Sequence, residues 1–269
     1  MESIGFIGAG NMAEALIKGI ISAKLYSPKN IFISDIKPDR LKAIIDKYGV
    51  TPAATNAKLS AKVDILILSV KPQIMADALK SIQGSVNHAK LVISIAAGIK
   101  ISQITSVLGD IPIIRVMPNT PALIGAGATA IFAGDKARPM LDKAVAIFSS
   151  VGKAVVVDSE DLIDVVTAVS GSGPAYFFLL MEEMIKAATD LGLPEQVAKD
   201  LVLQTAKGAG LLAVDGDKRG ETPATLRQKV TSPGGTTEAA LKIFSDGNIG
   251  ALIASAIKHA RDRSVELSR

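Results

Sequence analysis

Three glycine-rich segments stand directly before predicted helices, where backbone N–H groups can bind an anion. They are Gly8–Ala13 (Gly-Ala-Gly-Asn-Met-Ala), Ser170–Tyr176 (Ser-Gly-Ser-Gly-Pro-Ala-Tyr) and Val230–Thr237 (Val-Thr-Ser-Pro-Gly-Gly-Thr-Thr). The first turn of a helix leaves its N–H groups without intrahelical partners, and the helix dipole adds partial positive charge there. These segments therefore predict sites for phosphate or carboxylate groups.

The first segment has the spacing of a dinucleotide-binding loop. A predicted strand ends at Gly8, and a helix begins near Asn11. Gly8 permits the tight turn, Gly10 lets a pyrophosphate approach the backbone, and Ala13 lets the helix pack on the strand. The alternative is a turn with a purely structural role. The residues predicted to bind the pyrophosphate are Gly8, Ala9, Gly10, Asn11 and Met12.

Asp35 ends the second predicted strand, where an acidic side chain hydrogen-bonds the adenosine ribose of NAD. We predict that Asp35 and the preceding Ser34 belong to the cofactor site, which favours NADH. The nearby Lys37 and Arg40 can still attract the 2′-phosphate of NADPH, so the choice of cofactor stays open. The alternative is that Asp35 only caps the helix that follows Pro38.

The elements that must position these residues alternate in type over residues 1–158. Short β-rich runs lie at Ile4–Ile7, Ile31–Ser34, Val63–Val70, Leu91–Ile95, Ile113–Met117, Ala128–Phe132 and Ala154–Val157, with helical stretches between them. Such alternation predicts an α/β fold with a Rossmann-like, doubly wound, mostly parallel sheet. The strands are apolar at consecutive positions, so both faces of the sheet should be buried.

Three further strand ends should face the same crevice, because ligands of open α/β sheets bind beyond the carboxyl ends of the strands. These ends are Val70-Lys71-Pro72, Ala96-Ala97-Gly98 and Met117-Pro118-Asn119-Thr120-Pro121. On local grounds alone, Pro and Gly at such points are also ordinary strand terminators.

Residues 159–269 show only helical periodicity and form the second predicted domain. Pro174 and Gly192 bracket one long helix, and Pro194 opens the next. The last helix carries more apolar residues, such as Ile253 and Ile257, than so small a domain needs to cover itself. This surplus predicts a dimer through the C-terminal helices.

Composition narrows the class of protein. The 269 residues are 48% hydrophobic and carry a net charge of +4, without basic clusters interleaved with aromatic residues, which disfavours nucleic acid as a partner. There is no Cys, and the two His residues have no ligand spacing, so we expect no metal. No signal peptide or membrane span is expected, and we predict a cytoplasmic protein.

Taken together, the three glycine-rich segments resemble the pyrroline-5-carboxylate reductase family, over a span from Ser3 to about Leu267. The resemblance implies an NADPH- or NADH-dependent enzyme that reduces 1-pyrroline-5-carboxylate, a cyclic imine, to L-proline, the final step of proline biosynthesis. It also implies a homodimer and leaves open a larger assembly of dimers. The active site should form where the C-terminal edge of the sheet meets the helical domain.

The resemblance assigns further site residues. The positions it places in the cofactor site are Asn56, Val70, Lys71, Pro72, Ala97, Gly98 and Pro118, the last bordering the nicotinamide. The substrate positions are Ser232, Gly234, Gly235, Thr236 and Thr237. The resemblance assigns the carboxylate to the backbone N–H groups of Gly234 to Thr236, and the ring nitrogen to a hydrogen bond with Thr237. Glu160 lies beside that nitrogen and favours the protonated imine. From local sequence alone, Thr236 or Thr237 is a helix cap, and Glu160 offsets a helix dipole.

Two other functions fit the sequence less well. Hydroxyacid dehydrogenases of similar architecture place a catalytic Lys early in the first long helix of the second domain, but this chain has no Lys there before Lys186. A non-catalytic dinucleotide sensor would not need the substrate loop at Val230–Thr237.

Overall fold

The computed structural model describes residues 2–267; Met1, Ser268 and Arg269, at the outer ends of the two predicted domains, lie outside the described residues. The strands are β1 (Ile4–Ile7), β2 (Ile31–Ser34), β3 (Thr51–Pro52), β4 (Ile65–Leu68), β5 (Leu91–Ser94), β6 (Ile113–Met117), β7 (Gly127–Ala133) and β8 (Gly152–Val156). The helices are α1 (Asn11–Ser22), α2 (Pro38–Tyr48), α3 (Asn56–Lys62), α4 (Met75–Lys80), α5 (Ile101–Leu108), α6 (Leu141–Ser149), α7 (Leu162–Val166), α8 (Gly173–Asp190), α9 (Glu195–Asp217), α10 (Pro223–Lys229), α11 (Thr236–Asp246) and α12 (Ile249–Leu267).

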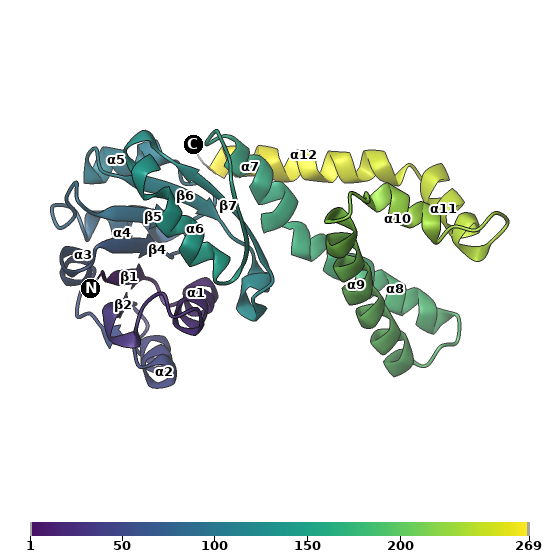
Figure 1. Cartoon of the computed structure of the whole chain (residues 1–269), viewed down its shortest axis with the longest axis horizontal. Coiled ribbons are helices and arrows are strands. Elements are labelled where there is room, and N and C mark those ends of the chain that lie inside the picture. The colour runs from purple at the N-terminus through teal and green to yellow at the C-terminus, as the bar shows by residue number, and fades with distance from the viewer. Residues whose placement is uncertain (1, 268–269) are drawn as a thin grey trace. The chain divides into compact units, whose positions relative to one another are not determined.

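The strands form one sheet in the order β3-β2-β1-β4-β5-β6-β7-β8. All neighbouring pairs are parallel except β6 and β7. β1 pairs with β2 on one side and β4 on the other, with Ile4 opposite both Ile31 and Ile65. The predicted doubly wound, mostly parallel sheet is therefore confirmed, and the chain reverses its direction of travel across the sheet at β1 (Figure 1).

Each face of the sheet has its own apolar core. One cluster joins the strands to α1, α2 and α6, through residues such as Leu16, Ile44 and Phe148. The other joins them to α3, α4 and α5, through residues such as Leu59, Leu79 and Ile104. Every residue of β4 is buried, as the continuous apolar run predicted, because helices cover both faces.

Three local features differ from the sequence predictions. β3 contains only Thr51 and Pro52, too short to leave a periodic signal, and was not predicted. β4 is shorter than the predicted run from Val63 to Val70. The segment at Ser170 is not an anion-binding turn: Thr167–Gly171 forms a π-helical turn, in which the Ser172 N–H donates to the Thr167 carbonyl oxygen, and α8 follows at once.

The chain divides into two compact units, residues 1–174 with 258–269, and residues 175–257. The helices α8 and α12 begin in one unit and end in the other. The boundary predicted after Asp158 follows β8, where the strands end, and stays a prediction about the organisation of the chain.

Residues 175–257 have almost no core of their own. Within this range only Ala198, Val202 and Gly216 are buried. Large apolar side chains are instead exposed, including Phe177 at 65% and Leu252 at 68%. Gly208 and Gly210 in α9 have open space for 4 Å around the point where a Cβ would be, so no other helix of the described chain approaches them closely. These helices therefore leave apolar surface that one chain does not cover.

One helical run in the described chain, Leu162–Asp190, is long and apolar enough by length and composition to cross a membrane. Its longest uncharged stretch, between Asp164 and Glu182, is shorter than the roughly 18 residues expected of a membrane span, so the absence of a span stays a prediction. Core helices of globular assemblies share these properties, and the π-helical turn at Thr167–Gly171 interrupts the run.

Candidate active site

The loop between β1 and α1 has the geometry that a phosphate-binding turn needs. Gly8 adopts φ +100, and a Cβ there would lie 2.7 Å from the Ser69 carbonyl oxygen, so only glycine fits. Gly10 has open space where a Cβ would be. It is the N-cap of α1, and because it has no side chain it leaves the first-turn N–H groups uncapped. The N–H groups of Asn11 and Met12, in the first turn, have no intrahelical acceptor. The loop is therefore shaped to receive an anion.

Two charged side chains hold the peptide groups of Ala9 between these glycines. The Ala9 N–H donates to Asp35 Oδ2 at 2.6 Å, and the Arg40 Nε donates to the Ala9 carbonyl oxygen at 2.7 Å. The other Asp35 oxygen accepts from the Lys37 N–H at 2.8 Å. The N-cap of α2 is Lys37 and has no side-chain cap, so Asp35 fixes the loop rather than the first turn of that helix.

Arg40 is also paired with Glu14, a residue that sequence reasoning did not select. Arg40 Nη2 contacts Glu14 Oε2, while Lys47 Nζ and the Tyr48 hydroxyl each donate to Glu14 Oε1 at 2.9 Å. Hydrogen bonds from Lys47, Arg40 and Tyr48 lower the pKa of Glu14 to about 2, against the opposing effect of burial. The only sequence signal was an acidic residue in the first turn of α1.

Ser34 and Asn56, both predicted cofactor residues, are brought together at the end of β2. The Ser34 hydroxyl donates to Asn56 Oδ1 at 2.6 Å, and Asn56 Nδ2 donates to the Ser81 hydroxyl at 2.9 Å. Ser69, at the end of β4, was missed: its hydroxyl contacts the carbonyl oxygens of Ile7 and Gly8 at 2.9 and 2.7 Å. It joins the ends of β1 and β4 beside the glycine-rich loop.

The remaining predicted cofactor residues follow β4, β5 and β6 at the same edge of the sheet. Val70 is partly buried, Lys71 is exposed, and Pro72 opens a 3-10 turn. Ala97 and Gly98 follow β5, with Gly98 at φ +70 close to Leu267 of α12. Pro118 is buried after β6. Parallel strands bring their carboxyl ends to one edge, so these residues share it with Gly8; their contact with a cofactor stays a prediction.

Glu160 lies just before α7 and belongs to a partly buried polar cluster. Its Oε1 accepts from the Ile101 N–H at 2.7 Å and lies 3.4 Å from Arg115 Nη1. Arg115, on β6 and 1% exposed, also donates to Asp164 Oδ1 at 2.9 Å. The Ser264 hydroxyl donates to the same Asp164 oxygen at 2.8 Å. The Glu160 carboxylate therefore has two partners, the Arg115 guanidinium and the Ile101 N–H in the first turn of α5.

The predicted substrate loop connects α10 to α11. Gly234 adopts φ +71, and its N–H donates to Glu238 Oε2 at 2.7 Å. Gly235 is the N-cap of α11, and its N–H donates to the Ser232 carbonyl oxygen at 3.0 Å. The N–H groups of Thr236 and Thr237 begin the helix and have no intrahelical acceptors. Two of the three N–H donors predicted for a carboxylate, those of Gly234 and Gly235, thus already have partners, in α11 and in the loop.

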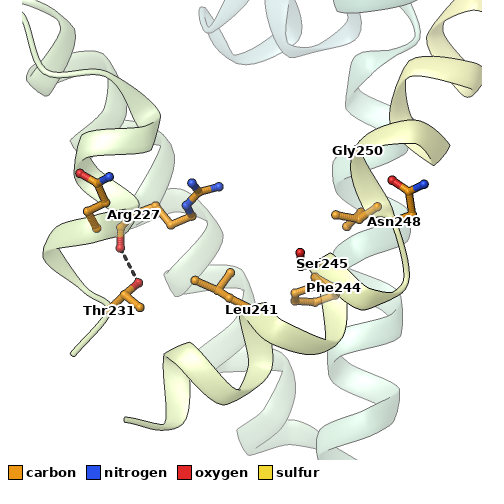
Figure 2. A pocket seen from close by; sticks show the side chains of 9 residues that line it. Arg227, Thr231, Leu241, Phe244, Ser245, Asn248 and Gly250 are labelled. Atoms are coloured by element: carbon orange, nitrogen blue, oxygen red, sulfur yellow. Dashed lines mark hydrogen bonds between the residues drawn. The ribbon is translucent and has the colours of Figure 1, made fainter. Parts of the chain in front are cut away.

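A hollow of about 580 Å³ lies beside this loop, within residues 175–257. Figure 2 shows Arg227 and Thr231 on one wall, with the Thr231 hydroxyl on the Arg227 carbonyl oxygen at 2.7 Å. Leu241, Phe244 and Asn248 stand on the other side. Within the segment Val230–Thr237 only Thr231 lines the hollow, so the hollow adjoins the predicted substrate residues without containing them.

Comparison with known proteins gives matches over the whole chain. Residues 160–267 match the pyrroline-5-carboxylate reductase dimerisation family, and residues 3–98 match the family described as NADP oxidoreductase coenzyme F420-dependent. Pyrroline-5-carboxylate reductase of Pseudomonas aeruginosa is 42% identical over 267 residues, which cover 98% of this chain and 96% of that protein.

Solved structures agree with these sequence matches. A pyrroline-5-carboxylate reductase from Coxiella burnetii superposes with a TM-score of 0.92 at 38% identity, covering 100% of this chain and 99% of the other. The Plasmodium falciparum pyrroline carboxylate reductase with NADP bound gives a TM-score of 0.86 at 30% identity, with coverage of 100% and 98%.

Proposed function

Because the chain belongs to the pyrroline-5-carboxylate reductase family, we infer that it reduces 1-pyrroline-5-carboxylate to L-proline with NADPH or NADH, the final step of proline biosynthesis. The observation that carries this conclusion is the similarity along the full length of the chain. The aligned region includes both the β1 to α1 loop and the segment Val230–Thr237, so the assignment of neither segment depends on its motif alone.

The residues around Gly8 fit a dinucleotide. The open space at Gly10 and the free first turn of α1 can accept a pyrophosphate, and Asp35 lies beside the loop where a ribose would be bound. The reduced nicotinamide, when bound, supplies the hydride. In this proposal Ser34, Asn56, Val70, Lys71, Pro72, Ala97, Gly98 and Pro118 line the rest of the cofactor site.

The substrate is held by the loop between α10 and α11. The free N–H groups of Thr236 and Thr237 bind its carboxylate, and Ser232, Gly234 and Gly235 shape the turn. Glu238 holds the Gly234 N–H, so a carboxylate must either displace Glu238 or use only the donors of α11. The Thr237 hydroxyl donates to or accepts from the ring nitrogen and orients the C=N bond for reduction.

Glu160 acts on the protonation of the imine in this proposal. A carboxylate near the ring nitrogen favours the iminium, which accepts hydride more readily than the neutral imine. Arg115 and the Ile101 N–H hold Glu160 in position and partly offset its charge, so its effect on the iminium should be modest. Solvent is the simplest proton donor to the nitrogen.

We also propose that the protein is a soluble, cytoplasmic homodimer. The family match to a dimerisation domain and the exposed apolar faces of α8, α9 and α12 support this, since a second copy would cover them. On this view the run Leu162–Asp190 packs in a protein interface rather than in a bilayer. Dimers can assemble further through surfaces that the helices leave free.

A steady-state assay tests the activity directly. The imine is mixed with enzyme and either NADPH or NADH, the loss of reduced nicotinamide is followed, and proline is identified as the product. Oxidation should require the imine and yield proline in equal amount. If neither cofactor is oxidised in an imine-dependent way by folded protein, the proposed function is wrong.

A further inference from the structure

We propose that Glu14 sets the cofactor preference of this chain by holding the Arg40 guanidinium on the glycine-rich loop and away from the 2′-phosphate of NADPH. The inference rests on the proposed function, because it requires that the β1 to α1 loop binds a nicotinamide dinucleotide.

Arg40 shares a hydrogen-bonding partner with Asp35, the residue predicted to bind the adenosine ribose. Its Nε donates to the Ala9 carbonyl oxygen at 2.7 Å, and the Ala9 N–H donates to Asp35 at 2.6 Å. Asp35 occupies the end of β2, the position from which an acidic residue binds the ribose 2′-hydroxyl and near which an Arg accommodates a 2′-phosphate. Arg40 and Asp35 thus bind the same residue, Ala9, so Arg40 lies next to the side chain predicted to bind the ribose.

Two of the three guanidinium nitrogens of Arg40 already have partners. Its Nη2 is paired with Glu14 Oε2, one turn into α1, so the fork is used on the loop and on this carboxylate. The Glu14 carboxylate is fixed in turn by Lys47 and Tyr48 from the end of α2. To bind a 2′-phosphate in a bidentate way, which uses Nη2 on either face of the guanidinium, Arg40 must give up its charge-assisted bond to Glu14. This cost applies to NADPH but not to NADH.

The Arg40–Glu14 pair is accessible enough to rearrange. The Arg40 side chain is 31% exposed and that of Glu14 is 18% exposed, so neither is locked in the core. Glu14 is ionised throughout the neutral range because its pKa lies near 2. Lys37, a cation in the turn after β2, is exposed and remains available to both cofactors.

The test measures dissociation constants of NADPH and NADH by fluorescence titration of the reduced nicotinamide. Glu14→Gln keeps the size of the side chain but removes its charge, and should lower the Kd for NADPH about tenfold while leaving that for NADH within about twofold. Asp46→Asn is the matched control, because it removes the carboxylate of the exposed Lys42–Asp46 pair on α2; neither Kd should change by more than about twofold.

Arg40→Met provides a second, independent readout. As a single substitution, Arg40→Met should raise the dissociation constants of NADPH and NADH by the same factor, because it loosens the Ala9 peptide without removing a contact to the 2′-phosphate. In the Glu14→Gln background it should abolish the gain for NADPH. Circular dichroism checks that each variant is folded.

The outcomes separate this inference from the proposed function. Failure of the parent to bind either cofactor overturns both. Binding of both with an unchanged Kd ratio in folded Glu14→Gln overturns the inference alone. The inference is also overturned if the single substitution Arg40→Met lowers affinity for NADPH alone, because Arg40 would then already contact the 2′-phosphate in the parent protein. This result holds even if Glu14→Gln does not fold.

Discussion

Arg115 and Asp164 form an ion pair with an Nη2 to Oδ1 distance of 2.9 Å, and their side chains are 1% and 2% exposed. The two residues are 49 positions apart and join β6 to α7, while Ser264 of α12 adds a hydrogen bond to the same carboxylate. The Arg115–Asp164 pair thus joins the sheet to α7 and, through Ser264, to α12, the first and last helices after the final strand.

Replacing Arg115 by Met should strongly destabilise the protein. The change leaves the Asp164 carboxylate buried without its cation, and breaking a buried pair in this way costs roughly 3–5 kcal/mol. Urea unfolding followed by circular dichroism measures the change. Arg138→Met is the control, because Arg138 and Asp135 are both mostly exposed and their pair should contribute less than about 1 kcal/mol. Equal effects of the two substitutions would contradict the stabilising role of the buried pair.

Stability should depend on Glu14 in acid. Its pKa is lowered from 4.5 to about 2 on folding, so its contribution is complete above pH 4.5 and is lost as the pH falls toward 2. The difference in unfolding free energy between the parent and Glu14→Gln should therefore shrink over this window. Urea titrations at several pH values measure it. A difference in unfolding free energy that stays constant with pH would show that folding does not lower the pKa of Glu14.

Thr237→Val should slow turnover while leaving cofactor affinity almost unchanged. The substitution removes a contact proposed only for the substrate, and a hydrogen bond to a charged group is worth roughly 1.5–3 kcal/mol, or one to two decades in kcat/KM. Thr236→Val is the matched control, because Thr236 is proposed to act through its backbone N–H, which Val retains. The assignment of Thr237 fails if both variants reduce the imine at the parent rate.

Asp35→Ser should shift the ratio of kcat/KM values toward NADPH by roughly tenfold or more. The change removes a repulsion from the 2′-phosphate and an attraction for the ribose hydroxyls. It also removes the acceptor of the Ala9 N–H, so affinity for both cofactors should fall. The ratio separates the two effects, and an unchanged ratio would leave Asp35 with only the loop-fixing role.

Sedimentation at low micromolar concentration should show a dimer or a larger assembly. Leu211→Asp, in the middle of α9 at a side chain 62% exposed, should weaken it by placing a charge on the apolar surface. Lys199→Asp, on another face of the same helix, is the control and should have little effect. A stable monomer of the parent protein at this concentration would refute the assembly.

The sequence by itself determined the order and type of most elements and the family. The apolar runs of β1, β2 and β4 and the Gly8–Ala13 spacing are local signals, because a strand period and a glycine turn are written within a few residues. For the same reason β3, which has only two residues, left no periodic signal. The π-helical turn at Thr167–Gly171 was interpreted as a loop, because glycines are typical both of loops and of irregular helical turns.

Only the tertiary structure decided how the polar residues are paired. Asp35 and Arg40 converge on Ala9 because the parallel strands β1 and β2 end at one edge of the sheet. Asp164 bonds to Ser264 across 100 residues because the end of α12 belongs to the same compact unit as the sheet. Local periodicity carries no record of such partners. For Glu160 and Arg40 the sequence showed a charge near a site, whereas the fold determined that each charge is already matched by another side chain.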